Sequence, residues 1–181
     1  MSGPLRVVRS ELLLRSHVFD VERRVVSDGD ATFEREVVVH PGAVAVLAVD
    51  DEGRIGLLRQ FRAPFDDVVL EIPAGTLDVA DETPLEAARR ELEEELGVTA
   101  AHWTLLGRYM VSPGWCTQVM NIFEARELTS VARHPTGPEE RDALVLWRTP
   151  AQLRADLRAE PLWDYTLTVA FLRVYGHLLD E

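Results

Sequence analysis

One segment, residues 83–97, constrains the fold more than any other part of the chain because it carries both the start and the stop signals of a single helix. Thr83, Pro84 and Glu86 form a capping box with proline at the first helical position. Gly97 supplies the left-handed residue that commonly ends a helix. The sequence therefore predicts a helix between Thr83 and Gly97.

Two neighbouring stripes of this predicted helix differ in chemistry. At about 100° per residue, Glu91, Glu94 and Glu95 fall within about 100° of arc. The stripe beside them, spanning roughly 60° to 140° from Glu91, is apolar and is expected to pack inward. It consists of Leu85, Ala88, Leu92 and Leu96. The helix is therefore expected to carry a core face and an acidic edge.

The acidic edge has two interpretations. Like charges three or four positions apart destabilise a helix by a few tenths of a kcal/mol per pair, and a divalent cation reverses that effect. Carboxylates with no nearby histidine or cysteine favour magnesium or manganese. The alternative is a solvated face on which acids and arginines pair four residues apart. The available pairs are Glu86 with Arg90, Arg89 with Glu93, and Arg90 with Glu94.

The order of residues around this helix resembles the Nudix box of the Nudix hydrolase superfamily. That box reads Gly, five residues, Glu, seven residues, Arg-Glu, an aliphatic residue, any residue, Glu-Glu, any residue, Gly, and an aliphatic residue. Glu82 and the run from Arg90 to Val98 fit it, but six residues separate Gly75 from Glu82. The predicted loop is therefore one residue longer, while the register of the helix is unchanged.

Further positions are similar to the ADP-ribose pyrophosphatase branch of that superfamily, over roughly residues 33–160. In that branch a proline lies about fifteen residues past the box, and Pro113 stands fifteen positions after Val98. Without the box, this proline would be read as part of an ordinary turn. The matching segments are Arg35-Glu36-Val37-Val38, Gln60-Phe61-Arg62, Leu70-Glu71-Ile72-Pro73-Ala74-Gly75 and Pro113-Gly114.

The resemblance implies metal-binding and catalytic roles for particular residues. Glu91 and Glu95 match the principal Mg²⁺ ligands, with Mn²⁺ as the alternative ion. Glu94 would assist them, and the backbone carbonyl of Ala74 would complete the shell. Glu82 and Arg90 match residues that support the catalytic site. For the general base, the resemblance points to a loop glutamate, Glu140 in slight preference to Glu139.

The resemblance implies substrate contacts as well. Arg35 and Arg62 are candidates for phosphate or ribose, because a guanidinium offers paired donors to diphosphate oxygens; each could equally be a surface ion-pair partner. The remaining candidates are Glu71, Pro113, Gly114 and, for adenine, Phe19. Relatives often place an acidic residue near position 118, where this chain has glutamine.

These expectations combine into a Mg²⁺-dependent hydrolase of a nucleoside diphosphate linked to another moiety, with ADP-ribose cleaved to AMP and ribose 5-phosphate as the preferred reaction. Another nucleotide sugar, such as GDP-mannose or ADP-glucose, is the first alternative. A Nudix ligand-sensing module without turnover is the second. The third is a structural acidic protein in which the box is coincidental.

The expected fold class is α/β, and the resemblance specifies a Nudix α/β/α sandwich with a mixed sheet and a small N-terminal antiparallel β unit. At 181 residues and 46% hydrophobic content, the chain can bury a sizeable core. Pro41-Gly42 marks a boundary between residues 1–40 and 41–181. The first part is expected to form a homodimer, because the branch exchanges this unit between subunits.

The periodicity and turn signals predict the following elements. They are an apolar segment from Glu11 to Val26, strands at 33–40, 43–49, 54–61, 68–72, 103–111, 118–125 and 143–148, and helices at 150–157 and about 162–179.

Composition narrows the partners and the location. Acidic residues outnumber basic ones by 31 to 19, and this balance argues against general affinity for nucleic acid. No signal peptide or membrane-spanning run is apparent, so no membrane partner is expected. Cys116 is the only cysteine, which suits a reducing compartment. We expect a cytoplasmic protein that binds a small molecule.

Overall fold

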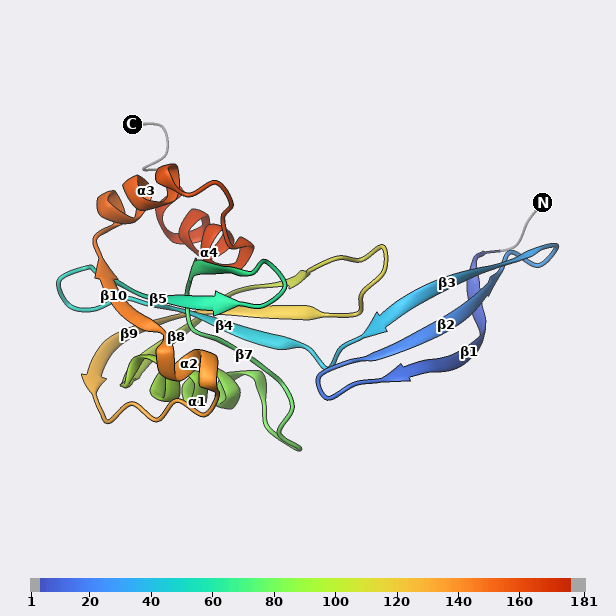
Figure 1. Cartoon of the computed structure of the whole chain (residues 1–181), viewed down its shortest axis with the longest axis horizontal. Coiled ribbons are helices and arrows are strands. Elements are labelled where there is room, and N and C mark those ends of the chain that lie inside the picture. Colours follow the sequence, from blue (N-terminus) through green and yellow to red (C-terminus); the bar gives the residue numbers. More distant parts are fainter. Residues whose placement is uncertain (1–3, 177–181) are drawn as a thin grey trace.

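The chain folds into three β-sheets and four helices, as a computed structural model that describes residues 4–176 shows (Figure 1). The strands are β1 (Arg6–Arg15), β2 (Asp20–Ser27), β3 (Thr32–Val39), β4 (Ala43–Ala48), β5 (Ile55–Arg62), β6 (Asp67–Glu71), β7 (Ala74–Thr76), β8 (Val98–Met110), β9 (Val119–Ser130) and β10 (Leu144–Arg148). The helices are α1 (Pro84–Leu96), α2 (Pro138–Asp142), α3 (Pro150–Ala159) and α4 (Tyr165–Tyr175).

The body of the molecule contains two of the sheets. One has the order β7-β4-β9-β8, in which β4 and β9 are parallel and the other pairs are antiparallel. The second is antiparallel, with the order β10-β5-β6, so β6 is an edge strand. The first sheet is the mixed sheet that the sequence predicts.

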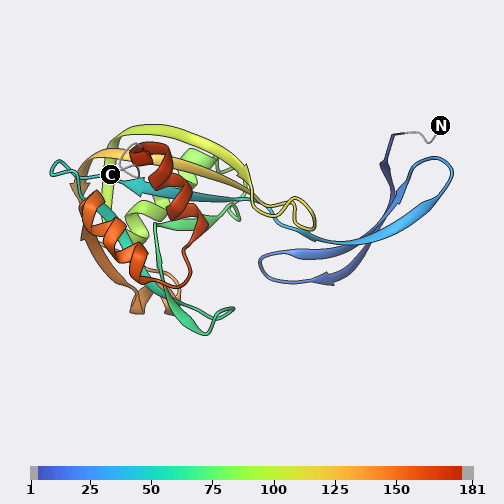
Figure 2. The same cartoon turned by 90° about the horizontal axis from the view of Figure 1, so that it is seen from above.

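Strand β4 lies at the centre because its side chains alternate between two hydrophobic cores. Val44, Val46 and Ala48 pack into the core that contains Leu92 of α1. The intervening residues, Ala43, Ala45 and Leu47, belong to the core formed with α3 and α4. Both faces of the sheet are therefore covered by helices (Figure 2). This arrangement confirms the predicted α/β/α sandwich.

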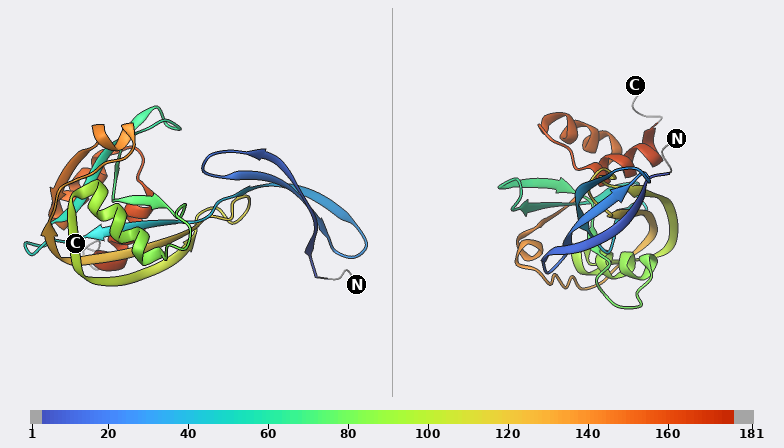
Figure 3. Two further views of the ribbon diagram at one scale, coloured as in Figure 1. Left: turned by 90° about the horizontal axis from the view of Figure 1, so that it is seen from below. Right: turned by 90° about the vertical axis from the view of Figure 1, so that its right-hand side faces the viewer.

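The first three strands form a separate antiparallel sheet, β1-β2-β3, that projects from the body (Figure 1 and Figure 3). Every residue of β1 is exposed, including Leu12 and Leu14. The end of β3 is joined to the body through the β8–β9 loop. The amide of Val38 donates to the carbonyl of Trp115 at 2.8 Å, and the amide of Thr117 donates to Val38 at 2.9 Å.

The predicted segment from Glu11 to Val26 is in fact two strands with a turn between them. The hydroxyl oxygen of Ser16 accepts hydrogen bonds from the amides of Val18 and Phe19 at 3.3 and 3.4 Å. Such local bonding by serine favours a turn over a continuing strand. A hydrophobic pattern alone does not reveal this reversal, because apolar and polar residues are mixed in the same way in both strands.

Other features also differ from the prediction. Strand β8 begins at Val98 rather than near residue 103, directly after the helix cap. Helix α4 begins at Tyr165 rather than Leu162, because Asp164 caps it by accepting from the amide of Leu167 at 2.8 Å. The predicted end of this helix near Leu179 lies outside the described residues. Finally, α2 is a short helix where a loop was expected.

Among residues 4–176, none of the helices combines the length and the apolar content needed to cross a membrane.

Candidate active site

Helix α1 starts as its sequence predicts. The hydroxyl oxygen of Thr83 accepts from the amide of Glu86 at 3.3 Å, and the carboxylate of Glu86 accepts from the amide of Thr83 at 2.8 Å. Gly97 ends the helix with a φ of 66°, in the left-handed region. Both ends of α1 are thus fixed locally, which sets the rotation of its side chains relative to the sheets.

Two of the predicted metal-binding carboxylates point into the protein. Glu91 is 7% exposed and Glu95 is 2% exposed, whereas Glu94 is partly buried. Buried carboxylates are rare unless they are paired or bind a cation. The alternative of a solvated acidic face therefore does not describe Glu91 and Glu95.

Strand β7 lies against these carboxylates. A side-chain carbon added to Gly75 would lie only 1.9 Å from the Oε1 atom of Glu91, so no other residue fits here without displacing Glu91. Beside it, the amide of Ala74 donates to the Oε2 atom of Glu95 at 2.9 Å. The structure thus places Ala74 at the acids, in contact through its amide rather than through the carbonyl that the resemblance singles out.

Arg90 is the cation that organises the outer part of this cluster. Its guanidinium donates to both carboxylate oxygens of Glu82, at 3.0 and 3.1 Å, and to Glu91 at 2.6 Å. Glu94 lies 3.6 Å from the same guanidinium. Glu82 reaches Arg90 despite the additional loop residue, and Asp81 adopts a φ of 64° just before it. Aspartate tolerates this left-handed conformation better than most residues.

The pKa values of the buried acids show that their charge is poorly compensated. Burial raises the pKa of Glu95 to about 8, against the lowering effect of the Ala74 amide, and Glu91 raises it further. Burial also raises the pKa of Glu91 to about 7, although Arg90 opposes the shift. Arg90 is shared by Glu82, Glu91 and Glu94, and Arg62 acts on Glu95 only through its charge, so ionisation of the buried acids is incompletely compensated.

This donor set fits a hard divalent cation, because it offers only oxygen ligands and an uncompensated negative charge. The carboxylates are not already arranged as a ligand cluster: among residues 4–176, no three acidic, histidine or cysteine side chains are grouped closely enough to hold an ion. The Arg90 contacts to Glu91 and Glu94 occupy the oxygens that an ion would use.

Arg62 and Glu71, both predicted substrate contacts, form an ion pair on neighbouring strands. The Arg62 guanidinium donates to both oxygens of Glu71 at 2.7 to 2.9 Å. Burial raises the pKa of Glu71, and this effect outweighs the opposing hydrogen bond from Arg62. The charges of Glu95 and Glu139 also act on Arg62, so the pair borders the acidic cluster.

The two candidate bases lie on α2 and differ in their surroundings. The Oε2 atom of Glu140 accepts from the amides of Thr136 and Gly137 at 2.7 and 3.0 Å, and from the Thr136 hydroxyl at 3.1 Å. Burial alone would raise the pKa of Glu140, but these hydrogen bonds lower it. Glu139 is exposed.

Sequence reasoning missed Arg133, which fixes α2 against the helix that carries the acids. Its guanidinium donates to the carbonyl of Glu95 at 2.6 Å and to the carbonyl of Glu140, also at 2.6 Å. Backbone carbonyls belong to every residue, so no local pattern could have indicated these contacts.

The remaining candidates lie farther from the acids within one chain. Arg35 is exposed on β3 in the projecting sheet, where its guanidinium lies 4.5 Å from the ring centre of Phe33. Phe19 is in the β1–β2 turn and lines a shallow pocket with His40 and Pro41. Pro113 and Gly114 are exposed in the β8–β9 loop.

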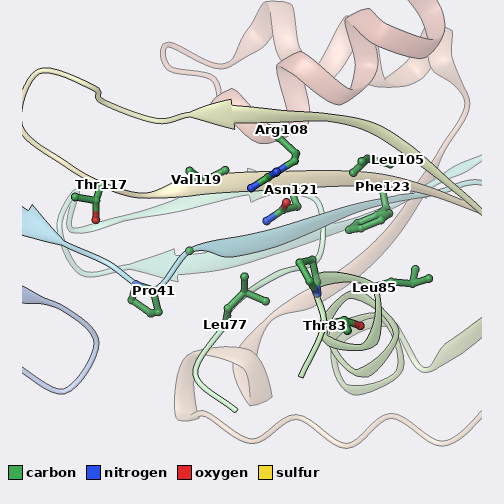
Figure 4. Close-up of a pocket in the computed structure, with 12 residues that line it drawn as sticks. Pro41, Leu77, Thr83, Leu85, Leu105, Arg108, Thr117, Val119, Asn121 and Phe123 are labelled. Carbon is green, nitrogen blue, oxygen red and sulfur yellow. The ribbon is translucent and has the colours of Figure 1, made fainter. Parts of the chain in front are cut away.

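A separate, mainly apolar cavity of about 550 Å³ lies on the α1 side of the mixed sheet. Figure 4 shows Leu77, Leu85 and Phe123 around it, with Arg108 and Asn121 on the strands. The Asn121 side chain donates to the carbonyl of Ala43 at 3.0 Å. None of the predicted metal-binding carboxylates lines this cavity, so it is distinct from the acidic cluster.

Comparison with known proteins places this site in a family. The NUDIX domain matches residues 39–168. The chain is 43% identical over 126 residues to an ADP-ribose pyrophosphatase from Bacillus subtilis, which covers 68% of this chain and 67% of that protein. It is 37% identical over 155 residues to an ADP-ribose pyrophosphatase from Mycobacterium tuberculosis, with 84% and 75% covered. The chain belongs to the Nudix family, as a pyrophosphohydrolase.

Two further matches each cover more than four fifths of both chains. A GDP-mannose pyrophosphatase from Pectobacterium atrosepticum is 31% identical over 163 residues, with 83% of this chain and 82% of that protein covered. A crystal structure of an ADP compounds hydrolase superposes with a TM-score of 0.83 at 23% identity and covers 99% of this chain and 97% of that one. That similarity includes the projecting sheet as well as the body and confirms the fold.

Proposed function

We propose that this protein is a Mg²⁺-dependent hydrolase of ADP-ribose that releases AMP and ribose 5-phosphate, with Mn²⁺ as the alternative ion. The observation that carries the proposal is the pair of buried, poorly compensated carboxylates, Glu91 and Glu95, held against β7 at Gly75. The substrate is suggested by the names of the Bacillus subtilis and Mycobacterium tuberculosis relatives.

In this proposal Glu91, Glu95 and Glu94 hold the ion, and the carbonyl of Ala74 completes its shell. A bound ion would supply charge neutralisation at the phosphate oxygens and a lower pKa for the attacking water. Water adds to one phosphorus and gives a proton to the general base, the bond from that phosphorus to the bridging oxygen breaks, and the bridging oxygen leaves with the other phosphate. Arg90, anchored by Glu82, orients the carboxylates.

On the substrate side, Arg62 is the candidate for a phosphate or ribose contact, since its guanidinium borders the acids. Glu71 holds that guanidinium in place. Pro113 and Gly114 are proposed to contact the substrate from the β8–β9 loop.

For the general base, the hydrogen bonds of Glu140 change the preference. A carboxylate that already accepts three hydrogen bonds and has a lowered pKa is a weak base, so we favour Glu139. Glu139→Gln is expected to lower kcat by about a hundredfold or more. Glu140→Gln is expected to act mainly on stability, because it weakens the cap of α2. A large loss of kcat in Glu140→Gln alone, with the fold intact, would reverse this assignment.

We further propose that the protein is a cytoplasmic homodimer, assembled through residues 1–40, whose active site takes Arg35 and Phe19 from the partner. Within one chain these two residues lie in the projecting sheet rather than at the acids (Figure 1). The apolar side chains of β1 are exposed within one chain, which supports an assembly in which the partner covers them. Residues 41–181 form the catalytic unit in this proposal.

A substrate panel tests the function. ADP-ribose, ADP-glucose and GDP-mannose are incubated with Mg²⁺, and the products are separated by chromatography. GDP-mannose is included because a relative bears that substrate in its name. We expect AMP and ribose 5-phosphate from ADP-ribose at the highest kcat/KM. Tight binding of ADP-ribose without any turnover would favour a ligand-sensing module instead.

Glu91→Gln and Glu95→Gln test the assigned metal ligands. Each keeps the size of the side chain and removes its charge, so we expect loss of Mg²⁺ binding and of hydrolysis. Unchanged hydrolysis in both folded variants would contradict the assigned metal ligands.

A further inference from the structure

A second cavity, of about 360 Å³, lies between the edge strand β6 and the connection from α3 to α4 (Figure 1). We call it the aromatic pocket, because Phe65, Trp163 and Tyr165 line it. It also includes Leu70 and the acids Glu71 and Asp164. None of the site residues predicted from the sequence lines it except Glu71.

The three rings are unusually accessible for large side chains. Phe65 is 66% exposed, Trp163 is 50% exposed and Tyr165 is 37% exposed. Exposed aromatic side chains that line one cavity can supply stacking contacts to a planar ligand. Leu70 and Val69 of β6 add apolar contact area at the bottom.

The charge of the aromatic pocket selects against phosphate. None of the residues that line it is basic, whereas Asp67, Glu71, Glu160 and Asp164 are acidic. Arg59 pairs with Glu160 and Arg62 with Glu71. Asp67 and Asp164 each accept a backbone hydrogen bond through one carboxylate oxygen, from Val68 and Leu167 respectively. Carboxylates accept hydrogen bonds and repel anions. A ring that carries N–H donors fits this wall, and a phosphate does not.

The aromatic pocket adjoins the acidic cluster through the chain itself. Glu71 ends β6 and lines the pocket, and three residues later the amide of Ala74 contacts Glu95. Three residues span at most roughly 10 Å, which is comparable to the length of a nucleotide. When the pyrophosphate of a substrate lies at the acids, a ring attached to one end of that substrate can therefore reach the aromatic pocket.

We propose that the aromatic pocket is a subsite for a planar heteroaromatic ring with N–H donors, attached to one end of the pyrophosphate substrate, and that Trp163 and Tyr165 stack on this ring. This inference rests on the proposed function for its link to hydrolysis. The ring is one of two groups. It is the base of the ADP half, or it is a second base linked to the far phosphate.

The first experiment measures binding without turnover. Adenosine and ribose 5-phosphate are titrated separately into the metal-free protein by calorimetry, using wild type, Trp163→Ala and Leu172→Ala. Leu172 is 43% exposed on α4 and lines a neighbouring cavity that Trp163 also borders, so Leu172→Ala controls for an effect through that neighbouring cavity. Adenosine should bind about tenfold more weakly to Trp163→Ala than to wild type and Leu172→Ala. Equal adenosine affinity in all three proteins, or no adenosine binding to wild type, would overturn the subsite.

The second experiment identifies the source of the ring. The KM of wild type and Trp163→Ala is measured for ADP-ribose and for diadenosine diphosphate. A KM raised for both substrates assigns the aromatic pocket to the base of the ADP half. A KM raised only for diadenosine diphosphate assigns it to the second base. A KM unchanged for both overturns a role in substrate binding.

The two proposals fail in distinguishable ways. If wild type hydrolyses neither substrate, the proposed function is wrong, and adenosine binding still decides the subsite. If wild type hydrolyses both substrates but Trp163→Ala binds adenosine as tightly as wild type does, the proposed function stands and the proposed subsite is wrong.

Discussion

Gly75 shows how one residue of β7 constrains the chemistry of the helix. Its missing side chain is the space that the carboxylate of Glu91 occupies. The approach brings the backbone of β7 close to the acids. A glycine in the Nudix-box position is therefore a steric requirement here rather than a need for an unusual backbone conformation.

Gly75→Ala tests that requirement. The added methyl group must displace Glu91, so we expect Mg²⁺ affinity and kcat/KM to fall at least about tenfold, with a stability loss of about 1–3 kcal/mol from overpacking. Calorimetric Mg²⁺ titration and urea unfolding measure the two effects. Gly176→Ala is the control, because its added carbon meets no neighbour and its φ of −56° suits alanine. Equal Mg²⁺ affinity in both variants would contradict the steric role of Gly75.

The raised pKa values of Glu91 and Glu95 predict a pH dependence of stability in the metal-free protein. The folded pKa of Glu95, about 8, exceeds the ordinary value of 4.5, so the folded chain binds this proton more tightly than the unfolded chain. The resulting stabilisation is complete below the unfolded pKa and is lost as the pH rises through the folded pKa.

Urea unfolding in the presence of EDTA should therefore give a free energy that falls between about pH 5 and about pH 8. Glu95→Gln, which cannot ionise, should flatten this dependence, and added Mg²⁺ should restore stability at the upper end. A free energy that rises over this pH interval in wild type would show that the buried carboxylates are adequately compensated.

At the level of elements, α1 was predictable from its sequence because its signals are local. The capping box, the terminal glycine and the apolar stripe each lie within a few residues of one another. The reversal after β1 and the start of α4 were placed less well, because they depend on hydrogen bonds of Ser16 and Asp164 that compete with the hydrophobic pattern.

In the candidate site, too, local signals could be predicted from the sequence and contacts between distant residues could not. Helical spacing indicated Glu91 and Glu95, and the resemblance to the Nudix box added Glu82 and Arg90. The structure joins Arg90 to Glu82 and Glu91. Arg133 and the aromatic pocket could not be named from the sequence, since their partners are distant in the chain and include backbone groups. The metal ligands and the base stay predictions.

Thr83→Ala tests the contribution of the cap to α1. Loss of the hydroxyl acceptor should lower the free energy of unfolding by about 1 kcal/mol. Thr149→Ala is matched, because Thr149 caps α3 with the same box. We expect a similar stability loss from both substitutions, measured by urea unfolding, but reduced hydrolysis only in Thr83→Ala. Equal hydrolysis in both variants would show that the position of the acids does not depend on this cap.

The whole molecule consists of a body with two hydrophobic cores and a sheet with little core of its own. All of β1 is exposed, and three strands without a buried face are marginal in water. The apolar side chains of β1 therefore need a covering surface. The apolar cavity beside Pro41 and Gly42 belongs to the body near the point where this sheet is attached (Figure 4).

Leu14→Arg tests the proposed dimer. A charge on β1 should convert a dimer to a monomer and lower kcat/KM by about tenfold or more, if the partner supplies contacts to the substrate. Leu144→Arg is the control, since Leu144 is 64% exposed on β10 of the body. Light scattering at low protein concentration measures the mass. A fully active wild-type monomer would rule the dimer out.

Val38 donates a hydrogen bond to Trp115 and accepts one from Thr117, and these two bonds join the projecting sheet to the loop that carries Pro113 and Gly114. A tilt of the sheet therefore pulls directly on that loop, with no intervening flexible linker. In the proposed dimer, association of the projecting sheets would therefore act on the loop that is proposed to contact the substrate, through one short stretch of backbone.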